Sequence, residues 1–248
     1  MSQTAPAPPT LRNHLLAALP PDSLARLAPM LEPAEMVFRA TLHGSGERIA
    51  RVYFPQSGWV SLLAPLEDGD VAEVGLVGNE GMIGLPLLLG VDQDSLEAMV
   101  QGPGTALALT AAAFRDAVGA DVVLRTLLLR YAQVHLMQLS RTAACNGRHQ
   151  IEQRLARWLL MSHDRAQSDE FPMTHEFLGM MLGVRRASIS VAAGALQKAG
   201  LIHYERGFIT VTDRPGLENA SCECYGIVRH DADSVLAPGS HGRDTYRA

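Results

Sequence analysis

Residues 174–202 read THEFLGMMLGVRRASISVAAGALQKAGLI, and this stretch decides the fold of the C-terminal part of the chain. Thr174 is a good N-cap for a short apolar helix, and Gly183 suits the tight turn that would end it. A second helix is predicted from about Arg185 to the residues before Gly200. Its buried face follows from apolar side chains at i, i+3, i+4 and i+7, which are Ile189, Ala192, Ala193 and Leu196. Two helices joined by about three residues that include a glycine have the spacing of a helix-turn-helix.

A helix before this unit and a hairpin after it complete a winged arrangement. The segment 151–159 has the pattern of an amphipathic helix, with its inner face formed by Ile151, Leu155, Trp158 and Leu159. After the second helix, residues 201–205 and 208–212 read as two strands joined at Arg206 and Gly207. The sequence therefore predicts a winged helix-turn-helix.

The first half of the chain has a different sequence pattern, which is typical of short strands. Apolar runs at 36–38, 51–54, 59–63, 71–77, 97–100 and 105–109 are separated by turns rich in Gly, Pro, Asn and Asp. Many short strands at close spacing are typical of a sandwich or a barrel. A parallel sheet is disfavoured because the sequence predicts no helix between these runs that is long enough for a crossover.

A long helix is predicted between the two halves, from Asp121 to about Arg141. It carries a wide apolar stripe that needs a partner. The candidate contact residues are Leu124, Leu127, Leu128, Tyr131 and Val134. The stripe would pack either on the chain's own sandwich or on the same helix of a second subunit, and the preference of oligomers for two-fold dimers favours the second subunit.

Composition bounds the class of protein. The chain has 248 residues, 47% of them apolar, so a sizeable core is expected. No apolar run is long enough to span a membrane, the N-terminus lacks the features of a secretory signal, and a cytoplasmic location is expected. The sequence shows no catalytic motif, so we expect no enzyme, no cofactor and no metal.

Three cysteines are present, Cys145, Cys222 and Cys224. Their spacing fits neither a disulfide framework nor a four-ligand zinc site. Because Cys222 and Cys224 are two positions apart on a predicted helix, their thiols are expected to face different sides.

Charge is unevenly distributed. The net charge is −5, but residues 141–212 carry nine basic against six acidic residues, whereas residues 1–140 carry eight against fourteen. This asymmetry suggests a division of labour, with the basic segment coinciding with the predicted winged helix.

Taken together, these features resemble the Crp/Fnr superfamily of bacterial transcription regulators. The resemblance covers roughly residues 15–215 and is strongest in the helix-turn-helix stretch. It extends to VYFPQSGWVSL at 52–62 and to VGNEGMIG at 77–84. It implies an α+β chain with an N-terminal jelly-roll-type β sensor domain, a long dimerisation helix and a C-terminal winged helix-turn-helix. The expected division is a tail at 1–10, a sensor domain at 11–118, the dimerisation helix at 119–145, the DNA-binding domain at 146–230 and a tail at 231–248.

The resemblance also implies that the second helix of the motif enters the major groove of DNA. Arg186 matches the position that the family uses to read a guanine, which suits a guanidinium because its fork can bind O6 and N7 together. Arg185 would meet a phosphate at the helix start. Two residues depart from well-known members, since Ala187 and Val191 replace a glutamate and an arginine and could contact only thymine methyls. The expected DNA-binding residues are Thr174, Arg185, Arg186, Ala187, Ser188, Ser190, Val191 and Arg206.

The sensor half departs from the family more strongly. Cyclic-nucleotide binders use a glutamate for the ribose and an arginine for the cyclic phosphate, but here Leu85 falls near the first position and Asp94 near the second. A carboxylate beside a buried phosphate is unfavourable, so binding of cyclic AMP in the usual way is not expected. A different effector is expected in a pocket formed by Leu85, Leu87, Leu88, Asp94 and Ser95. Iron–sulfur members need cysteines near the N-terminus, and none precedes Cys145.

The sequence thus predicts a dimeric, sequence-specific DNA-binding regulator. Its expected partners are double-stranded DNA, a second copy of itself, an unidentified small molecule and, as a candidate, RNA polymerase, without any membrane. The alternative is a ligand- or protein-binding regulatory module whose winged helix no longer binds DNA specifically.

Overall fold

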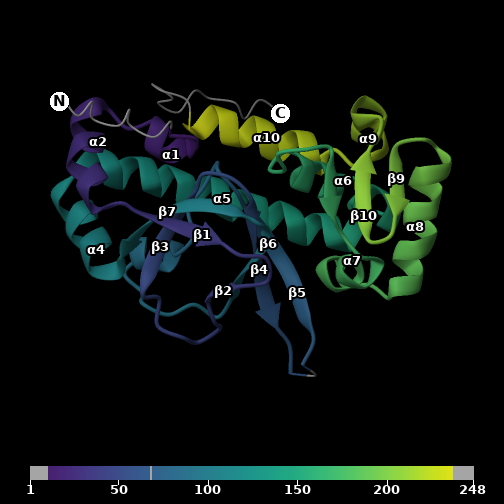
Figure 1. The fold of residues 1–248 in the computed structure, drawn as a ribbon, viewed down its shortest axis with the longest axis horizontal. Helices are drawn as coiled ribbons and strands as arrows, with labels where there is room; N and C mark the ends of the chain where they lie inside the picture. Colours follow the sequence, from purple (N-terminus) through teal and green to yellow (C-terminus); the bar gives the residue numbers. More distant parts are fainter. Residues whose placement is uncertain (1–10, 68, 237–248) are drawn as a thin grey trace, which may run out of the picture.

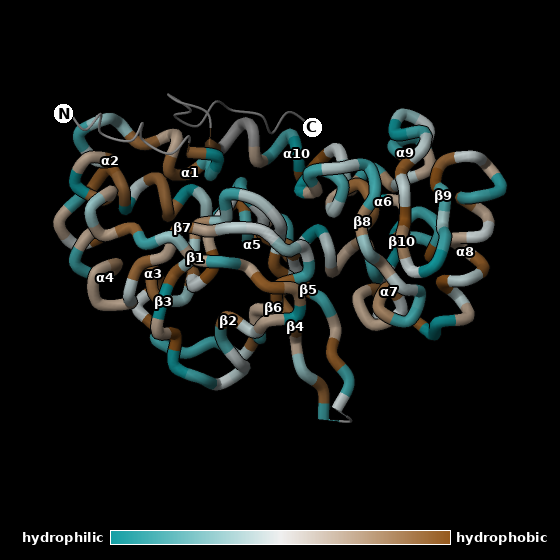
Figure 2. Tube along the Cα trace, viewed as in Figure 1, coloured by the Kyte–Doolittle hydropathy of each residue, from teal (hydrophilic) through white to brown (hydrophobic). Residues whose placement is uncertain are grey.

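The computed structural model describes residues 11–67 and 69–236, and in it a β-sandwich, a long helix and a winged helix-turn-helix follow one another along the chain (Figure 1). The molecule is mixed α+β. In the helices at both ends of the molecule, hydrophobic and hydrophilic residues alternate along the chain (Figure 2). This is expected for helices that bury one face. Among the described residues, no helix is both long enough and apolar enough to cross a membrane.

Two antiparallel sheets form the sandwich. The first has the order β1-β7-β3, with bounds Glu32–Met36, Gly104–Thr110 and Arg51–Pro55. The second has the order β2-β6-β4-β5, with bounds Thr41–His43, Glu97–Gly102, Trp59–Pro65 and Val71–Val77. Buried side chains from both sheets, such as Met36, Val60 and Val100, form the core between them. Five of the six predicted apolar runs overlap a strand that lies where it was expected.

The first predicted strand is displaced. The sequence placed it at 36–38, but β1 ends at Met36, and Val37 and Phe38 are exposed. Arg39 has a φ of 64°, so the chain turns there and cannot continue as a strand. β2 was not predicted, because three residues are too few to show an alternation of apolar and polar side chains.

Short helices close one end of the sandwich. They are α1 (His14–Ala17), α2 (Pro21–Leu27), the 3-10 helix η1 (Ala28–Met30), α3 (Leu85–Leu88) and α4 (Ala111–Ala120). Their apolar side chains share a core with the first half of α5 (Val122–Arg148), the long predicted helix. Asp121 caps α5, since its Oδ1 accepts hydrogen bonds from the backbone of Val123 and Leu124.

The winged unit follows α5. Its helices are α6 (Ile151–His163), α7 (His175–Leu182) and α8 (Arg186–Lys198). A three-stranded sheet of order β8-β10-β9 adds the wing, with bounds Glu170–Pro172, Phe208–Val211 and Ile202–Glu205. The predicted inner face of α8 is buried, and it consists of Ile189, Ala192, Ala193 and Leu196. β8 was not predicted, because its three residues pair with a strand 36 or more positions later in the chain.

Two further helices complete the described chain, α9 (Arg214–Ala220) and α10 (Cys224–Leu236). α10 packs along α5. The prediction that Cys222 and Cys224 share a helix and face different sides is wrong. α9 ends at Ala220, Cys222 lies in the link, and Cys224 is the first residue of α10, so both thiols turn toward Cys145 in one buried cluster.

Candidate DNA-binding surface and sensor pocket

The helix-turn-helix is fixed by local hydrogen bonds of the expected kinds. The Thr174 side chain caps α7 by accepting a hydrogen bond from the backbone of Phe177 at 3.2 Å. Gly183 ends α7 with a φ of 62°, a left-handed conformation that glycine adopts without strain. Arg185 is the N-cap of α8, and Arg186 is its first helical residue.

One face of α8 is exposed, and most of the predicted DNA-binding residues lie on it. Arg185, Arg186, Ala187, Ser190 and Val191 are exposed, whereas Ser188 is half-buried. Val191 is 69% exposed, so this face also presents an apolar side chain. The helix contains no acidic residue. A cationic helix start with an apolar side chain one turn further along has the chemistry of a groove-binding surface.

Ser190 is less free than the sequence suggested. Its hydroxyl donates to the carbonyl of Arg186 at 3.2 Å and lies 3.1 Å from Nδ1 of His175. The ring of His175 stacks on Tyr204, with centroids 4.1 Å apart. His175 and Tyr204 therefore belong to the same surface, and sequence reasoning missed both. The available signal was a histidine in the first turn of an otherwise apolar helix.

The wing presents Arg206 at its tip. Arg206 has a φ of 51° and Gly207 a φ of 85°, the conformation of a two-residue hairpin turn. The Arg206 side chain is 89% exposed, and its Nε lies 3.5 Å from a carboxylate oxygen of Glu205. The wing therefore carries an exposed cation at its tip.

Buried polar contacts join the winged unit to the sandwich. Glu73 on β5 accepts hydrogen bonds from Nε1 of Trp158 on α6 at 2.6 Å and from the Ser61 hydroxyl at 2.5 Å. Burial raises the pKa of Glu73 to about 7, against the opposing effect of these hydrogen bonds. Arg165 at the end of α6 forms an ion pair with Glu80 at 2.6 Å. Ionisable groups of the sandwich therefore help to set the orientation of the winged unit.

A pocket of about 160 Å³ lies between α3, β2, the loop before β6 and α5. Its lining includes His43, Leu85, Leu89, Asp94 and His135. Both imidazoles are buried, and burial lowers the pKa of each. Neither nitrogen of His43 has a hydrogen-bond partner among the described residues. No arginine or lysine is among the described residues that line this pocket.

The predicted pocket residues are only partly right. Leu85 and Asp94 line the cavity, but Leu87 is buried in the core beneath α3 and Leu88 packs against that core. Ser95 is exposed, and its carbonyl accepts a hydrogen bond from Ser45 instead. α3 is a single turn, so alternate leucines face opposite sides and cannot all line one cavity. His43 and His135 also line this cavity, but no sequence pattern indicated that these two residues lie close together.

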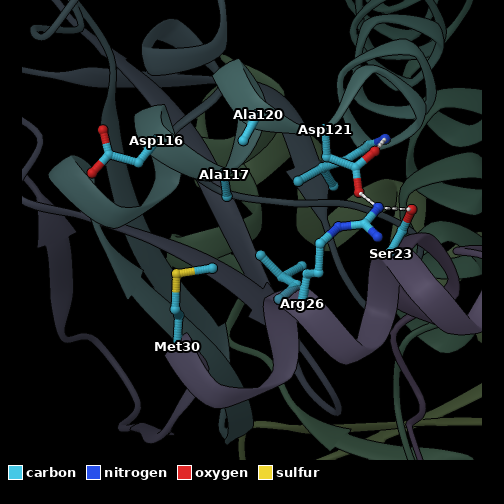
Figure 3. Close-up of a pocket in the computed structure, with 9 residues that line it drawn as sticks. Ser23, Arg26, Met30, Asp116, Ala117, Ala120 and Asp121 are labelled. Atoms are coloured by element: carbon cyan, nitrogen blue, oxygen red, sulfur yellow. Dashed lines mark hydrogen bonds and ion pairs between the residues drawn. The ribbon is translucent and has the colours of Figure 1, made fainter.

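A second cavity, of about 220 Å³, lies between α2 and α4 (Figure 3). An ion pair of 2.6 Å between Arg26 and Asp121 closes one side, and Ser23 accepts a hydrogen bond from the same guanidinium. These contacts hold the Asp121 pKa at about 2. The rest of the lining is largely apolar, apart from the exposed carboxylate of Asp116. Because Arg26 and Asp121 are already paired with each other, we assign no ligand to this cavity.

The predicted dimer-contact residues need correction. Leu124, Leu128, Tyr131 and Val134 are buried within their own chain, and Leu127 packs on the same core. They face the sandwich and α10, which was the alternative left open by the sequence. The exposed apolar residues of α5 are Val122, Val123, Leu129 and Leu136. Three of these recur every seven residues, as in a coiled-coil seam.

Comparisons with known proteins agree with this architecture. Residues 33–121 match the model of the cyclic nucleotide-binding domain, and residues 153–220 match the Crp-like helix-turn-helix domain. No curated protein sequence matches the chain.

Solved structures share the fold. FixK2 from Bradyrhizobium japonicum is similar with a TM-score of 0.66 at 20% identity, covering 77% of this chain and 98% of that one. A putative regulator of the Crp/Fnr family from Eubacterium rectale has a TM-score of 0.66 at 16% identity, covering 83% and 96%. A CRP-family transcriptional regulator from Thermus thermophilus has a TM-score of 0.63 at 20% identity, covering 78% and 96%. With both domain models matched in this order around one long helix, the chain belongs to the Crp/Fnr family of DNA-binding transcription regulators.

Proposed function

We propose that the chain binds an inverted-repeat DNA site as a dimer, with α8 of each subunit in the major groove. The observation that carries this proposal is the exposed face of α8, which begins with Arg185 and Arg186 and has no acidic side chain. Arg186 would read a guanine, and Arg185, at the N-cap, would contact a phosphate. Val191 and Ala187 would contact thymine methyls. Arg206 would contact the backbone from the wing.

The dimer would form through the exposed stripe of α5. Leu129 and Leu136 are 46% and 57% exposed and lie two helical turns apart on one face. Such an exposed apolar pair would be buried if it packed on the same helix of a second copy. A two-fold dimer of this kind would place its half-sites about 10 base pairs apart, centre to centre.

The effector would be a small molecule without a phosphate group. A pocket of about 160 Å³ is smaller than most ligand sites, which measure about 300–1,000 Å³. Its polar groups are two neutral imidazoles and the carboxylate of Asp94, which suit a hydrogen-bonding or cationic ligand and oppose an anion.

Selection of binding sites from random DNA tests the assignment of the arginines. Arg186→Ala should lose preference at one base pair per half-site and about 1–3 kcal/mol of discrimination there, because a bidentate guanine contact is removed. Arg185→Ala should weaken binding to all DNA sequences by a similar factor. The slope of log affinity against log salt concentration should fall by about one per subunit, because one phosphate contact is lost. Lys198→Ala, an exposed cation in the last turn of the same helix, is the matched control and should change neither quantity.

Two outcomes would contradict this assignment. If Arg186→Ala kept the full site preference, another residue would be the reader. If neither arginine affected binding, α8 would not lie in the groove, and a module that acts through protein partners would become the better explanation.

A further inference from the structure

Three cysteines and a histidine meet where the end of α5 passes the start of α10. The ligand atoms of Cys145, His149, Cys222 and Cys224 all lie within 4.8 Å of one another. Sγ of Cys145 is 3.5 Å from Sγ of Cys222, and Sγ of Cys224 is 3.7 Å from Nδ1 of His149. All three thiols are buried. A set of four N and S atoms this close has the composition of a structural zinc site.

The chain builds this cluster from two short segments. Cys145 and His149 are four residues apart at the end of α5, so they share a face. His149 is the C-cap residue of α5. Cys222 and Cys224 flank one residue in the turn between α9 and α10, so both sulfurs reach the same point. The last turn of one helix and the first residues of another therefore supply two ligands each.

The surroundings suit a metal centre that carries thiolates. Nε2 of His149 lies 3.2 Å from a carboxylate oxygen of Glu223, which orients the ring and leaves Nδ1 directed at the sulfurs. Arg157 is only 5% exposed and lies near Cys145, and its Nε has no hydrogen-bond partner among the described residues. A buried guanidinium is stabilised by a nearby negative charge, which thiolates at this cluster would supply.

We propose that Cys145, His149, Cys222 and Cys224 bind one Zn²⁺ in tetrahedral geometry. Zinc–sulfur bonds of about 2.3 Å place two thiolate sulfurs about 3.8 Å apart in a tetrahedron, close to the observed separations. On binding, the three thiols release three protons and the imidazole coordinates as the neutral base. Zn²⁺ with three thiolates has a net charge of −1, which Arg157 compensates.

Other uses of the cluster fit the geometry less well. A disulfide between Cys145 and Cys222 would leave Cys224 and His149 without a role. An iron–sulfur cluster would hold its cysteine sulfurs further apart than a single ion does, because the cluster itself lies between them. A tetrahedral set of sulfur and nitrogen ligands is characteristic of zinc.

Such a site would fix the DNA-binding unit relative to α5. Arg154 on α6 donates from Nε to Asn146 of α5 at 3.1 Å and from Nη2 to the Leu182 carbonyl at the end of α7. Asn146 directly follows the ligand Cys145. Zinc would therefore anchor α10 on α5 beside the residue that links α5 to the helix-turn-helix.

Elemental analysis of the full-length protein, purified without chelators, tests the site directly. We expect one zinc per chain. Replacement by Co²⁺ should give the visible bands of a tetrahedral ion and a thiolate charge-transfer band. These readouts use the unaltered chain and do not depend on any variant folding.

Variants then assign the ligands. Cys222→Ser and His149→Ala should lose the stoichiometric metal, whereas His203→Ala, an exposed histidine of the wing, should retain it. Glu223→Gln should weaken zinc affinity by about 10–100-fold while leaving the site formed. The proposal would be overturned by protein that is folded yet free of bound metal, by iron in place of zinc, or by a Cys145–Cys222 disulfide in the freshly purified chain.

Discussion

At the scale of single residues, Glu73 is the group most sensitive to pH. Its pKa of about 7 lies above its ordinary value because it is buried between β5 and α6. The folded protein therefore keeps a proton that the unfolded chain loses between about pH 4.5 and pH 7. It follows that this residue's contribution to stability is fully present below about pH 4.5, declines as the pH rises, and is lost above about pH 7.

Glu73→Gln should flatten this dependence. The amide can still accept from Trp158 and donate to Ser61, so the packing is kept while the ionisation is removed. Between about pH 4.5 and pH 7, the free energy of unfolding of the unaltered protein should fall by at most about 3 kcal/mol more than that of the variant. Denaturant titrations at several pH values measure this difference. Glu35→Gln, at an exposed position of β1, should follow the unaltered protein; equal slopes in all three proteins would rule out the assignment.

Single residues also show what a sequence can and cannot predict. The exposed positions of Arg185, Arg186 and Val191 follow from the helical spacing of the buried residues between them, which is a local property. The cluster of Cys145 and Cys222 does not, because these residues are 77 positions apart and meet only through the packing of α10 on α5. His43 and His135 meet in the sensor pocket for the same reason.

At the scale of elements, α5 shows why an apolar stripe does not identify its own partner. This helix of 27 residues is apolar on more than one side. The side that carries Leu128 and Tyr131 was predicted to meet a second subunit, but the sandwich and α10 cover it. Hydrophobic periodicity fixes which residues share a face. It does not say which of two apolar faces the rest of the chain will cover.

Dimerisation through the other face can be tested by charge. Leu129→Glu combined with Leu136→Glu should give folded monomers, because each exposed leucine would lose about 1.5–3 kcal/mol of burial in the seam. Sedimentation velocity at micromolar concentration measures the change. Val37→Glu, which adds one negative charge at a 53% exposed position on the sandwich, should remain dimeric. Leu128→Glu should unfold the chain instead of dissociating it, since Leu128 is fully buried.

At the scale of the whole molecule, the order of the domains was predictable and the identity of the signal was not. Strand-length runs, one long helix and a helix-turn-helix spacing are all local patterns, and their order along the chain is itself informative. The pocket proposed for the effector is assembled from α3, β2, the loop before β6 and α5, which are far apart in sequence. For this region the sequence predicts that no cation lies where a cyclic phosphate would bind. No arginine or lysine is among the described residues that line the pocket.

That absence leads to a prediction about the complete regulator. Neither cyclic AMP nor cyclic GMP should bind specifically at physiological concentration, because the described pocket lining offers the carboxylate of Asp94 and two neutral imidazoles to a phosphate that needs a guanidinium. Calorimetry with both nucleotides should show no saturable heat, and neither should alter the affinity of the dimer for its selected DNA site. Asp94→Ala separates charge repulsion from cavity size. If removal of the carboxylate alone allowed a cyclic nucleotide to bind, the small volume of the cavity would not be what prevents binding. A micromolar dissociation constant for the unaltered protein, abolished by substitutions within residues 84–97, would show that the pocket accepts a cyclic phosphate after all, and the proposed class of effector would have to be abandoned.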